Sequence, residues 1–222
     1  MSTAERKLRE KEQRRAAIID AAERVFNAKG YANATIEDIA KEAELAKGTF
    51  YLYFDNKESL YLKVIMRGVL TFEGMLDTAL GREKTGVQKM RAACAAIYEF
   101  SKQYPQYYDI SISWYTLPYP ELVAMVWTEM TKNKTGYMVV CLEALKTGIK
   151  DGSIRPDLNP ALTWLFLFES TTSMIGVLRV DYLFKLNPGL TQDTIMNFTI
   201  DRLIQSIENT DNTKNKKEIL EG

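Results

Sequence analysis

Apolar residues recur at intervals of three and four along almost the whole chain, the spacing of an amphipathic α-helix. The first such stripe contains Ile18, Ala22, Val25 and Phe26, and it ends before Gly30, a residue type that commonly terminates helices. No segment shows the convincing alternation of apolar and polar residues that marks a half-buried strand. The pattern therefore predicts an all-α protein.

The same spacing predicts two short helices after Gly30, one beginning at Thr35 and one over residues 47–54. A long helix follows Asn56 and reaches Gly81, with Leu60 and Val64 on its buried face. Further helices are predicted over residues 87–103, 106–112, 120–150, 161–184 and 191–209. Residues 210–222 are polar and have few apolar anchors, so we expect a frayed tail.

The window from Thr35 to Leu60, TIEDIAKEAELAKGTFYLYFDNKESL, contains two short helices separated by a brief turn at residues 44–46. Thr35 can cap the first of them, and Asp38 stands three residues later, as in a capping box. Two short helices joined by so few residues are typical of the helix-turn-helix arrangement.

The predicted helix over residues 47–54 has two distinct faces. Phe50 and Phe54 are four residues apart, so they share one face and are expected to anchor the helix in the core. Gly48 and Leu52 lie about 160° away from Phe50, at 100° per residue. An outer face with one small residue and neighbours of modest reach suits a helix that enters the major groove of DNA.

Candidate DNA contacts follow from these positions. Tyr51 and Leu52 could touch base edges or thymine methyl groups, and Lys47, Thr49 and Tyr53 could bind phosphates. Thr35 and Lys57 each stand at a helix start, where free N–H groups favour an anion. The alternative is ordinary packing, in which the tyrosines only cover the edge of the core.

The window resembles the DNA-binding signature of the TetR (tetracycline-repressor-like) family of transcriptional regulators. The resemblance rests on TIEDIAKEA, KGTFYLYF and NKESL, with Gly30-Tyr31 before them, and it covers residues 1–65 closely. It implies a helix-turn-helix DNA-binding domain over residues 1–58, a helical ligand-binding and dimerisation domain over 59–209, and a flexible tail over 210–222. By resemblance, the DNA contacts come from Thr35, Lys47, Gly48, Thr49, Tyr51, Leu52, Tyr53 and Lys57.

Two positions depart from the family pattern. The family usually has glycine where this chain has Glu44, and a non-glycine residue in a left-handed turn costs on the order of 1 kcal/mol. The family often has serine where Ala46 stands, and alanine cannot cap the next helix. Both changes could weaken phosphate contacts or shift the turn, and neither threatens the fold.

The chain as a whole carries no net charge, with 29 basic and 29 acidic residues, which argues mildly against a nucleic-acid partner. The charge is unevenly placed, however. Residues 1–15, the arm, have six basic and three acidic residues, a net charge of +3, whereas residues 16–58 have five and eight, a net charge of −3. The arm is either a source of phosphate contacts or a solvated, partly helical extension, and the sequence leaves both open.

The residue inventory excludes several kinds of chemistry. The chain has no histidine, so Ser-His-Asp and Cys-His catalysis and His-ligated zinc are excluded. Cys94 and Cys141 are too few for a structural zinc site and are typical of reduced intracellular thiols. We therefore predict no metal, no cofactor and no enzymatic activity. The apolar stretch over residues 161–178 carries Glu169 and several hydroxyls, which favours a buried helix in a cytoplasmic protein over a membrane span.

The region after residue 97 is rich in aromatic side chains and methionine, which can line an adaptable apolar pocket. For any single residue, a place in the core is the better interpretation. The candidate ligand-binding residues are Phe72, Tyr98, Tyr108, Trp114, Trp127, Met130, Tyr137, Phe168 and Glu169.

The last two predicted helices carry paired apolar stripes, and in the family the corresponding helices form a dimeric four-helix bundle. The candidate interface residues are Leu165, Thr172, Ile175, Phe198 and Leu203. The resemblance thus implies a homodimeric repressor, released from a palindromic operator by a small apolar or aromatic ligand. The alternative is a helical protein-interaction module without sequence-specific DNA binding.

Overall fold

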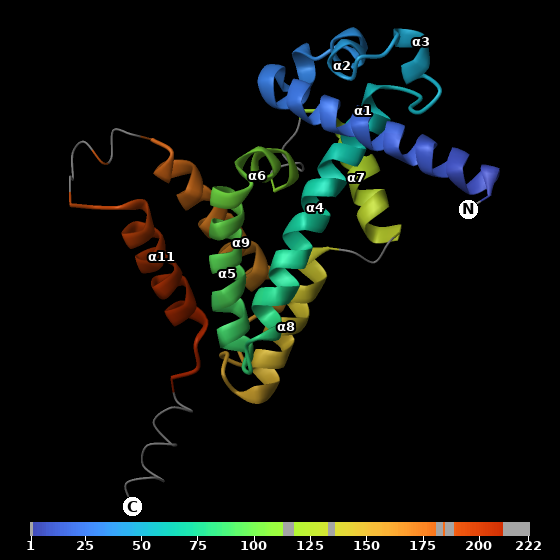
Figure 1. The fold of residues 1–222 in the computed structure, drawn as a ribbon. Coiled ribbons are helices and arrows are strands. Elements are labelled where there is room, and N and C mark those ends of the chain that lie inside the picture. The colour runs from blue at the N-terminus through green and yellow to red at the C-terminus, as the bar shows by residue number, and fades with distance from the viewer. Residues whose placement is uncertain (1, 113–117, 133–135, 181–183, 185–188, 211–222) are drawn as a thin grey trace, which may run out of the picture. The chain divides into compact units, whose positions relative to one another are not determined.

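A computed structural model describes residues 2–112, 118–132, 136–180, 184 and 189–210. In these residues the chain is helical, and the one β-type pairing is an isolated bridge between Ile154 and Glu208 (Figure 1). The all-α prediction is confirmed. The helices are α1 (Thr3–Asn33), α2 (Ile36–Glu42), α3 (Lys47–Phe50), α4 (Lys57–Gly81), α5 (Gly86–Gln103), α6 (Pro105–Ser111), α7 (Pro120–Lys132), α8 (Tyr137–Asp151), α9 (Pro160–Leu178) and α11 (Gln192–Ile207).

The chain divides into two compact units. The first unit comprises residues 1–69 and 106–132, and the second comprises residues 70–105 and 133–222. The predicted domain boundary between residues 58 and 59 falls within the first turn of α4, which continues through it to Gly81. That boundary and the functions assigned to its two sides stay predictions.

The core of the first unit is built around α1, which packs against α2. The predicted stripe of Ile18, Ala22, Val25 and Phe26 is buried. The only non-helical residue inside α1 is Gly30, with φ 72° and ψ 161°, a conformation that side chains disfavour. The N-terminal part of α1 extends past the two short helices (Figure 1).

The core of the second unit is formed by α5, α8, α9 and α11, which contact one another. Its largest fully buried side chains include Phe72, Phe100 and Ile97. The closest approach is between Gly86 and Gly148, because a Cβ atom on Gly86 would lie 2.2 Å from the backbone of Gly148. Hence α5 and α8 meet backbone to backbone at this point.

Three predicted helix boundaries were wrong. The predicted single helix over residues 120–150 is two helices, because Gly136, with φ 149°, cannot continue a helix before α8. α3 ends at Phe50, and residues 51–53 form tight turns in which Tyr53 N–H donates to the Phe50 carbonyl at 2.9 Å. α9 ends at Leu178 rather than Phe184. Apolar residues continue across the ends of α3 and α9, so the sequence pattern does not reveal those two, whereas residues 131–136 before α8 are the polar run TKNKTG.

Candidate functional site

The start of α2 has the predicted cap. The Thr35 Oγ1 atom accepts from the Asp38 N–H at 3.1 Å, and the Asp38 carboxylate accepts from the Thr35 N–H at 3.1 Å. Lys29 also contacts the Asp38 carboxylate at 2.6 Å. The Lys29 ammonium, followed by the Thr35 donors, lowers the pKa of Asp38 to about 2. The side chain of Thr35 is therefore already used within the domain.

The turn between α2 and α3 contains the two residues that depart from the family pattern, Glu44 and Ala46. Glu44 has φ 55°, and among the described residues no other non-glycine residue has a positive φ. Ala46 occupies the N-cap position of α3 and makes no side-chain hydrogen bond to the helix. The left-handed backbone at Glu44 and the missing cap at Ala46 are confirmed, and their expected effect on phosphate contacts stays a prediction.

Residues 47–54, the recognition segment, turn one side inward and one outward. Phe50 and Phe54 are buried, whereas 48% of Tyr51 and 74% of Leu52 is exposed. A Cβ atom added at Gly48 would meet no atom within 4 Å. Nothing inside the protein therefore requires glycine at this position, and the free space lies on the outer side. The inward and outward positions predicted for this segment are confirmed.

Lys47, at the start of α3, is exposed but forms an ion pair with Glu37 of α2. The hydrogen bond from the Lys47 ammonium lowers the pKa of Glu37 and raises that of Lys47. A phosphate that binds Lys47 would have to compete with this carboxylate. Sequence reasoning did not identify the pair, because its members are ten residues apart in different helices.

Lys57 lies where the sequence placed it, at the start of α4, but its ammonium is engaged within the protein. It donates to the carbonyl oxygens of Tyr31 at 2.9 Å and Ala34 at 3.1 Å, and it lies 4.3 Å from the centre of the Tyr31 ring. The Tyr31 hydroxyl in turn donates to Glu58 at 2.8 Å. Lys57 thus holds the end of α1 against α4, and a phosphate contact from it stays a prediction.

The arm is helical rather than irregular. α1 begins at Thr3, and Ser2 caps it in a reciprocal pair with Glu5. At the other end of the arm, the Arg15 guanidinium lies 4.9 Å from the centre of the Phe54 ring. The arm is therefore an extension of α1 that is joined to the end of the recognition segment.

In the second unit, aromatic side chains from α4, α5, α8 and α9 form one buried cluster. Its ring centroids are 5.2 Å apart for Phe72 and Phe100, 5.4 Å for Phe72 and Tyr137, and 5.5 Å for Tyr137 and Phe168. Trp164 completes it, 5.2 Å from Phe168. We call these five residues the aromatic cluster. It brings together three of the predicted ligand-binding residues, Phe72, Tyr137 and Phe168.

The other predicted ligand-binding residues are dispersed. Tyr108 and Met130 are buried in the first unit, where Trp127 is half-exposed on α7. Trp114 lies outside the described residues. Glu169 is half-buried on α9 in the second unit.

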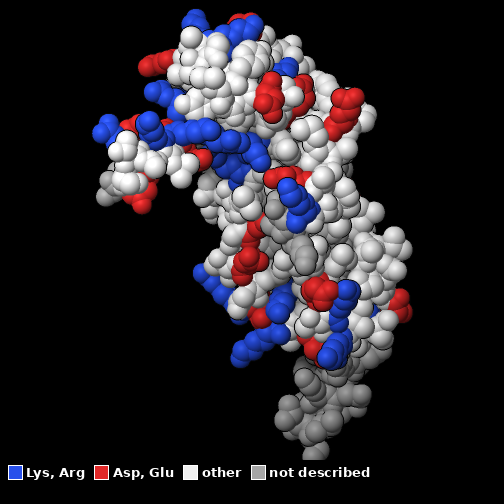
Figure 2. Space-filling model, turned by 90° about the vertical axis from the view of Figure 1, so that its right-hand side faces the viewer, with Lys and Arg blue, Asp and Glu red and all other residues white. Residues whose placement is uncertain are grey.

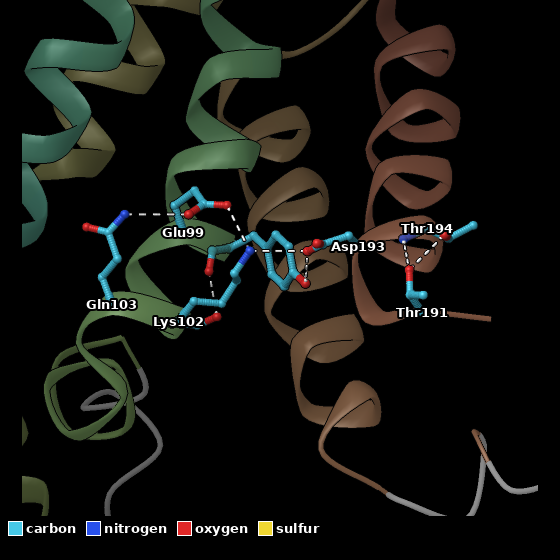
Figure 3. Close-up of polar contacts among 8 residues, drawn as sticks. Glu99, Lys102, Gln103, Thr191, Asp193 and Thr194 are labelled. Atoms are coloured by element: carbon cyan, nitrogen blue, oxygen red, sulfur yellow. Dashed lines mark hydrogen bonds and ion pairs between the residues drawn. The ribbon is translucent and has the colours of Figure 1, made fainter. Parts of the chain in front are cut away.

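Tyr98 is buried on α5, and its hydroxyl donates to the Asp193 carboxylate of α11 at 2.7 Å. The same carboxylate accepts from Lys102 at 3.2 Å, and Lys102 also contacts Glu99 at 3.3 Å (Figure 3). At the start of α11, Thr191 caps the helix through the Thr194 N–H. Tyr98 therefore ties α5 to α11, a role that its sequence position did not indicate.

Glu73, on α4, was not identified from the sequence. Its Oε1 atom is buried and has no hydrogen-bond partner among the described residues. Burial, and then the charge of Asp77, raise the pKa of Glu73, whereas a hydrogen bond from the Gly136 backbone opposes the shift. Glu73 thus supplies a backbone contact at the start of α8, which has no side-chain cap of its own.

The predicted dimer-interface residues fall into two groups. Leu165 and Phe198 are 55% and 62% exposed, whereas Ile175 and Leu203 are buried in the core of the chain. Thr172 is half-buried, and its hydroxyl donates to the Phe168 carbonyl at 3.0 Å. As a correction, Ile175 and Leu203 lie on the core-facing sides of α9 and α11. The exposed apolar side of α9 contains Leu162, Leu165, Phe166 and Val177.

Of the helices that the structure describes, only α9 is long and apolar enough to cross a membrane. Core helices of soluble proteins meet the same criterion, and Trp164, Leu167 and Phe168 of α9 are buried among protein side chains.

The two cysteines are buried and unpaired. Burial raises the pKa of the Cys94 thiol to about 11 and also raises that of Cys141, so both thiols are protonated at neutral pH. Within the described ranges, no group of three Cys, Asp or Glu side chains is placed to hold a metal ion.

Comparisons with known proteins agree with this architecture. Residues 18–64 match the family model of bacterial regulatory proteins, tetR family. The chain is 28% identical over 164 residues to the HTH-type transcriptional repressor KstR2 of Rhodococcus jostii, which covers 72% of this chain and 77% of that protein.

Two solved structures share the fold. FadR from Bacillus subtilis in complex with stearoyl-CoA has a TM-score of 0.69 at 22% identity and covers 85% of this chain and 97% of its own. AibR in complex with isovaleryl coenzyme A and operator DNA has a TM-score of 0.62 at 22% identity, with 86% and 98% covered. Residues 18–64, which contain the recognition segment, thus carry the DNA-binding signature of TetR-family transcriptional regulators, and the helices that follow share the fold of such regulators.

Proposed function

We propose that the protein is a homodimeric, cytoplasmic repressor that binds a palindromic operator through its recognition segment and is released by a small, largely apolar effector. The observation that carries the proposal is the recognition segment itself. Phe50 and Phe54 bury its inner side, while Leu52 is 74% exposed although it contributes nothing to the core. A large apolar side chain held outward on a short, anchored segment suits contact with thymine methyl groups and base edges.

The surroundings of the segment support approach to a DNA backbone. The open space at Gly48 would allow a phosphate or sugar to come close to the helix. Lys47 and the exposed Thr35 lie at helix starts, where phosphates are favoured. On binding, the Lys47 ammonium would exchange its Glu37 partner for a phosphate, so this contact adds less affinity than that of an unpaired lysine.

The proposed dimer is supported by the exposed apolar side of α9 together with Phe198 of the adjacent helix α11. A contiguous apolar surface on a soluble protein is typical of an interface. A twofold axis through it would pair two recognition segments, as a palindromic site requires.

To test the dimer, we would replace Leu165 by glutamate and measure the mass in solution by light scattering. We expect dissociation to monomers, because a charge would be buried at the interface. Leu190→Glu, at another exposed leucine of the second unit, is the matched control and should remain dimeric. A monomeric wild-type protein would contradict the proposal.

The proposed effector site is the second unit, with the aromatic cluster as its apolar wall. The structural neighbours FadR and AibR are in complex with stearoyl-CoA and isovaleryl coenzyme A. Acyl thioesters are therefore the first candidates for this chain as well. Binding would release DNA by favouring a conformation in which the two recognition segments no longer match the operator spacing.

DNA binding is tested by selecting duplexes from a random-sequence library and measuring affinity for the selected site by band shift. We expect Leu52→Ala to weaken binding by about fivefold or more, because one base contact is worth about 1–3 kcal/mol. The matched control, Leu190→Ala, removes an exposed leucine from the second unit and should not change the affinity. Failure to enrich any sequence would contradict sequence-specific binding.

Gly48→Ala separates a structural role from a DNA-binding role. Because a Cβ atom has room at this position, alanine should stabilise the helix by about 0.5–1 kcal/mol. It should nevertheless weaken operator binding, because the methyl group would occupy the space proposed for the DNA backbone. A variant that is more stable and binds as well as the wild type would remove Gly48 from the proposed contact surface.

The effector is tested by adding stearoyl-CoA or isovaleryl-CoA to the preformed complex with the selected duplex. Release of DNA at micromolar thioester, without release by free coenzyme A, is the expected result. Stabilised rather than released DNA would make the protein an effector-dependent binder and contradict the repressor mechanism.

A further inference from the structure

We propose that the arm is a rigid helical extension that binds the DNA backbone beside the operator through three basic residues, Lys7, Lys11 and Arg14. We call these three residues the basic stripe. The proposal rests on the proposed function, because it names a second DNA contact of the same regulator. The sequence alone left the arm open, either as a source of phosphate contacts or as a solvated extension. The structure supplies the direction in which its charges point.

That direction follows from the continuity of α1. The helix is regular from Thr3 to the residue before Gly30, so side-chain directions in the arm can be compared with those in the core. At 100° per residue, Lys7, Lys11 and Arg14 all lie within about 40° of the direction of Ile18. Ile18 is fully buried in the first unit. The basic stripe therefore continues the core-facing side of α1 beyond the edge of that core.

The other charged residues of the arm lie elsewhere around the helix. Arg9 points about 180° away from Ile18, and Glu5, Glu12 and Arg6 lie about 120–140° away. Glu10 lies about 80° away and is paired with Arg6, and Arg15 lies about 60° away. The arm thus has one basic side, which lies in line with the core-facing side of α1, and an opposite side that carries both acidic and basic residues. Figure 2 shows Lys and Arg side chains gathered along the projecting N-terminal part of the molecule.

Several basic residues of the first unit are paired with carboxylates, whereas those of the stripe, within the described part of the chain, are not. Arg24 is paired with Glu42, Lys29 with Asp38, and Lys47 with Glu37. Lys7, Lys11 and Arg14 are exposed, and among the described residues none of them forms an ion pair. An unpaired cation releases more free energy on meeting a phosphate, because no internal partner has to be displaced.

Two contacts hold the stripe in place. The Ser2–Glu5 capping box stabilises the free end of the helix, with N–H to side-chain distances of 2.6 and 3.2 Å. The Arg15 guanidinium, one residue after the stripe, lies over the ring of Phe54, the last residue of the recognition segment. The C-terminal end of the stripe therefore lies beside the end of the recognition segment. The stripe spans about 10 Å, which matches about three phosphates of one strand.

The composition of the arm favours DNA over a lipid surface. A helix that lies on a membrane needs a broad apolar side, whereas Leu8 is the only large apolar residue of the arm between Thr3 and Arg15. Positive charge without an apolar side is typical of contact with a phosphate backbone.

The test compares two charge-matched double variants of the full chain. Lys7→Gln with Lys11→Gln removes two charges from the stripe, and Arg6→Gln with Arg9→Gln removes two charges from the other sides of the same helix. The affinity for an arbitrary 30-base-pair duplex and for a selected duplex is measured as a function of salt concentration. We expect the stripe variant to reduce the slope of log K against log salt by about 1.8 for each bound protomer. The control variant should leave the slope near that of the wild type.

A third variant tests whether the helix must be rigid. Gln13→Pro keeps every charge but interrupts the helix between Lys11 and the domain, on the side away from the stripe. It should weaken DNA binding about as much as the stripe variant, whereas Gln13→Ala should not. Because the arm lies outside the core, thermal unfolding should be nearly unchanged in both.

Three outcomes would overturn the proposal. The first is an equal salt slope for the two double variants, and the second is unchanged DNA binding by the Gln13→Pro variant. The third is a stripe variant that loses binding to phosphatidylserine vesicles but binds DNA as well as the wild type. The proposed function fails separately. The wild type could enrich no sequence from the library and still bind the arbitrary duplex in a way that depends on the stripe. In that case the proposed arm contact is supported, and the proposed sequence-specific DNA binding is contradicted.

Discussion

Both units combine surface ion pairs with a buried apolar core, and they differ in which features stand out. In the first unit, ion pairs between helices lie at the surface, as in Lys29–Asp38 and Lys47–Glu37. In the second unit, the aromatic cluster and its neighbours bury large rings. Surface ion pairs contribute little each, whereas a buried aromatic side chain contributes several kilocalories per mole. The first unit thus retains the exposed surface that we propose for DNA, and the second provides the apolar surroundings that we propose for an effector.

The largest expected change in stability comes from the aromatic cluster of the second unit. Phe72→Ala should reduce the free energy of unfolding by about 3–5 kcal/mol, because it opens a cavity at a fully buried position. Leu52→Ala, at an exposed position, should change it by less than about 0.5 kcal/mol. Chemical denaturation measures both. Similar losses in the two variants would break the comparison.

A smaller effect tests the polar caps of the first unit. Thr35→Ala should reduce stability by about 1 kcal/mol, because the Asp38 N–H loses its acceptor. Thr35→Ser keeps the hydroxyl and serves as the control, with a change expected near zero. Thermal unfolding distinguishes the two. An unchanged Thr35→Ala variant would mean that the cap is not a source of stability.

The turn before the recognition segment should respond with the opposite sign. Glu44→Gly relieves a left-handed conformation worth about 1–2 kcal/mol but increases the entropy of the unfolded chain. The net result is a stabilisation below about 1 kcal/mol. Lys41→Gly, at an ordinary helical position of α2, should instead destabilise the protein. Equal effects of the two glycines would contradict the assigned strain.

The smallest effects concern pH, and the two units should differ in sign. The lowered pKa of Asp38 stabilises the fold above its unfolded value near 4, and this contribution is lost as the pH falls toward about 2. The pKa of Glu73 is raised, so its contribution is present below the unfolded value and is lost as the pH rises through the folded value.

At pH 7, therefore, Asp38→Asn should be less stable than the wild type and Glu73→Gln more stable. Glutamine keeps an acceptor for the Gly136 N–H while it removes the buried charge. Both differences should shrink toward pH 2, as followed by denaturation across this range. A Glu73→Gln variant that is less stable at every pH would show that its charge is not the origin of the effect.

Local rules accounted for much of the recognition segment. The positions of Phe50 and Phe54 inside and Leu52 outside follow from helical spacing, and the Thr35 cap follows from short-range hydrogen bonding. The roles of Lys57 and Tyr98 could not be predicted in this way. Their partners lie 23 to 26 and 95 residues away, so only the packing of separate helices brings them together.

By itself the sequence determined the helical fold class and the two faces of the recognition segment, because these depend on neighbours within a few turns. The strained turn at Glu44 was implied by the resemblance to the family. The tertiary structure decided which charges remain unpaired, which apolar residues are exposed and where the helices break. Ile175 and Leu203 are buried within the chain, while Leu165 and Phe198 are exposed. The direction in which the basic stripe faces could be assigned only because α1 is continuous from the arm into the core. The physical reason is that burial and charge pairing depend on distant elements, and helical periodicity does not specify which of them meet.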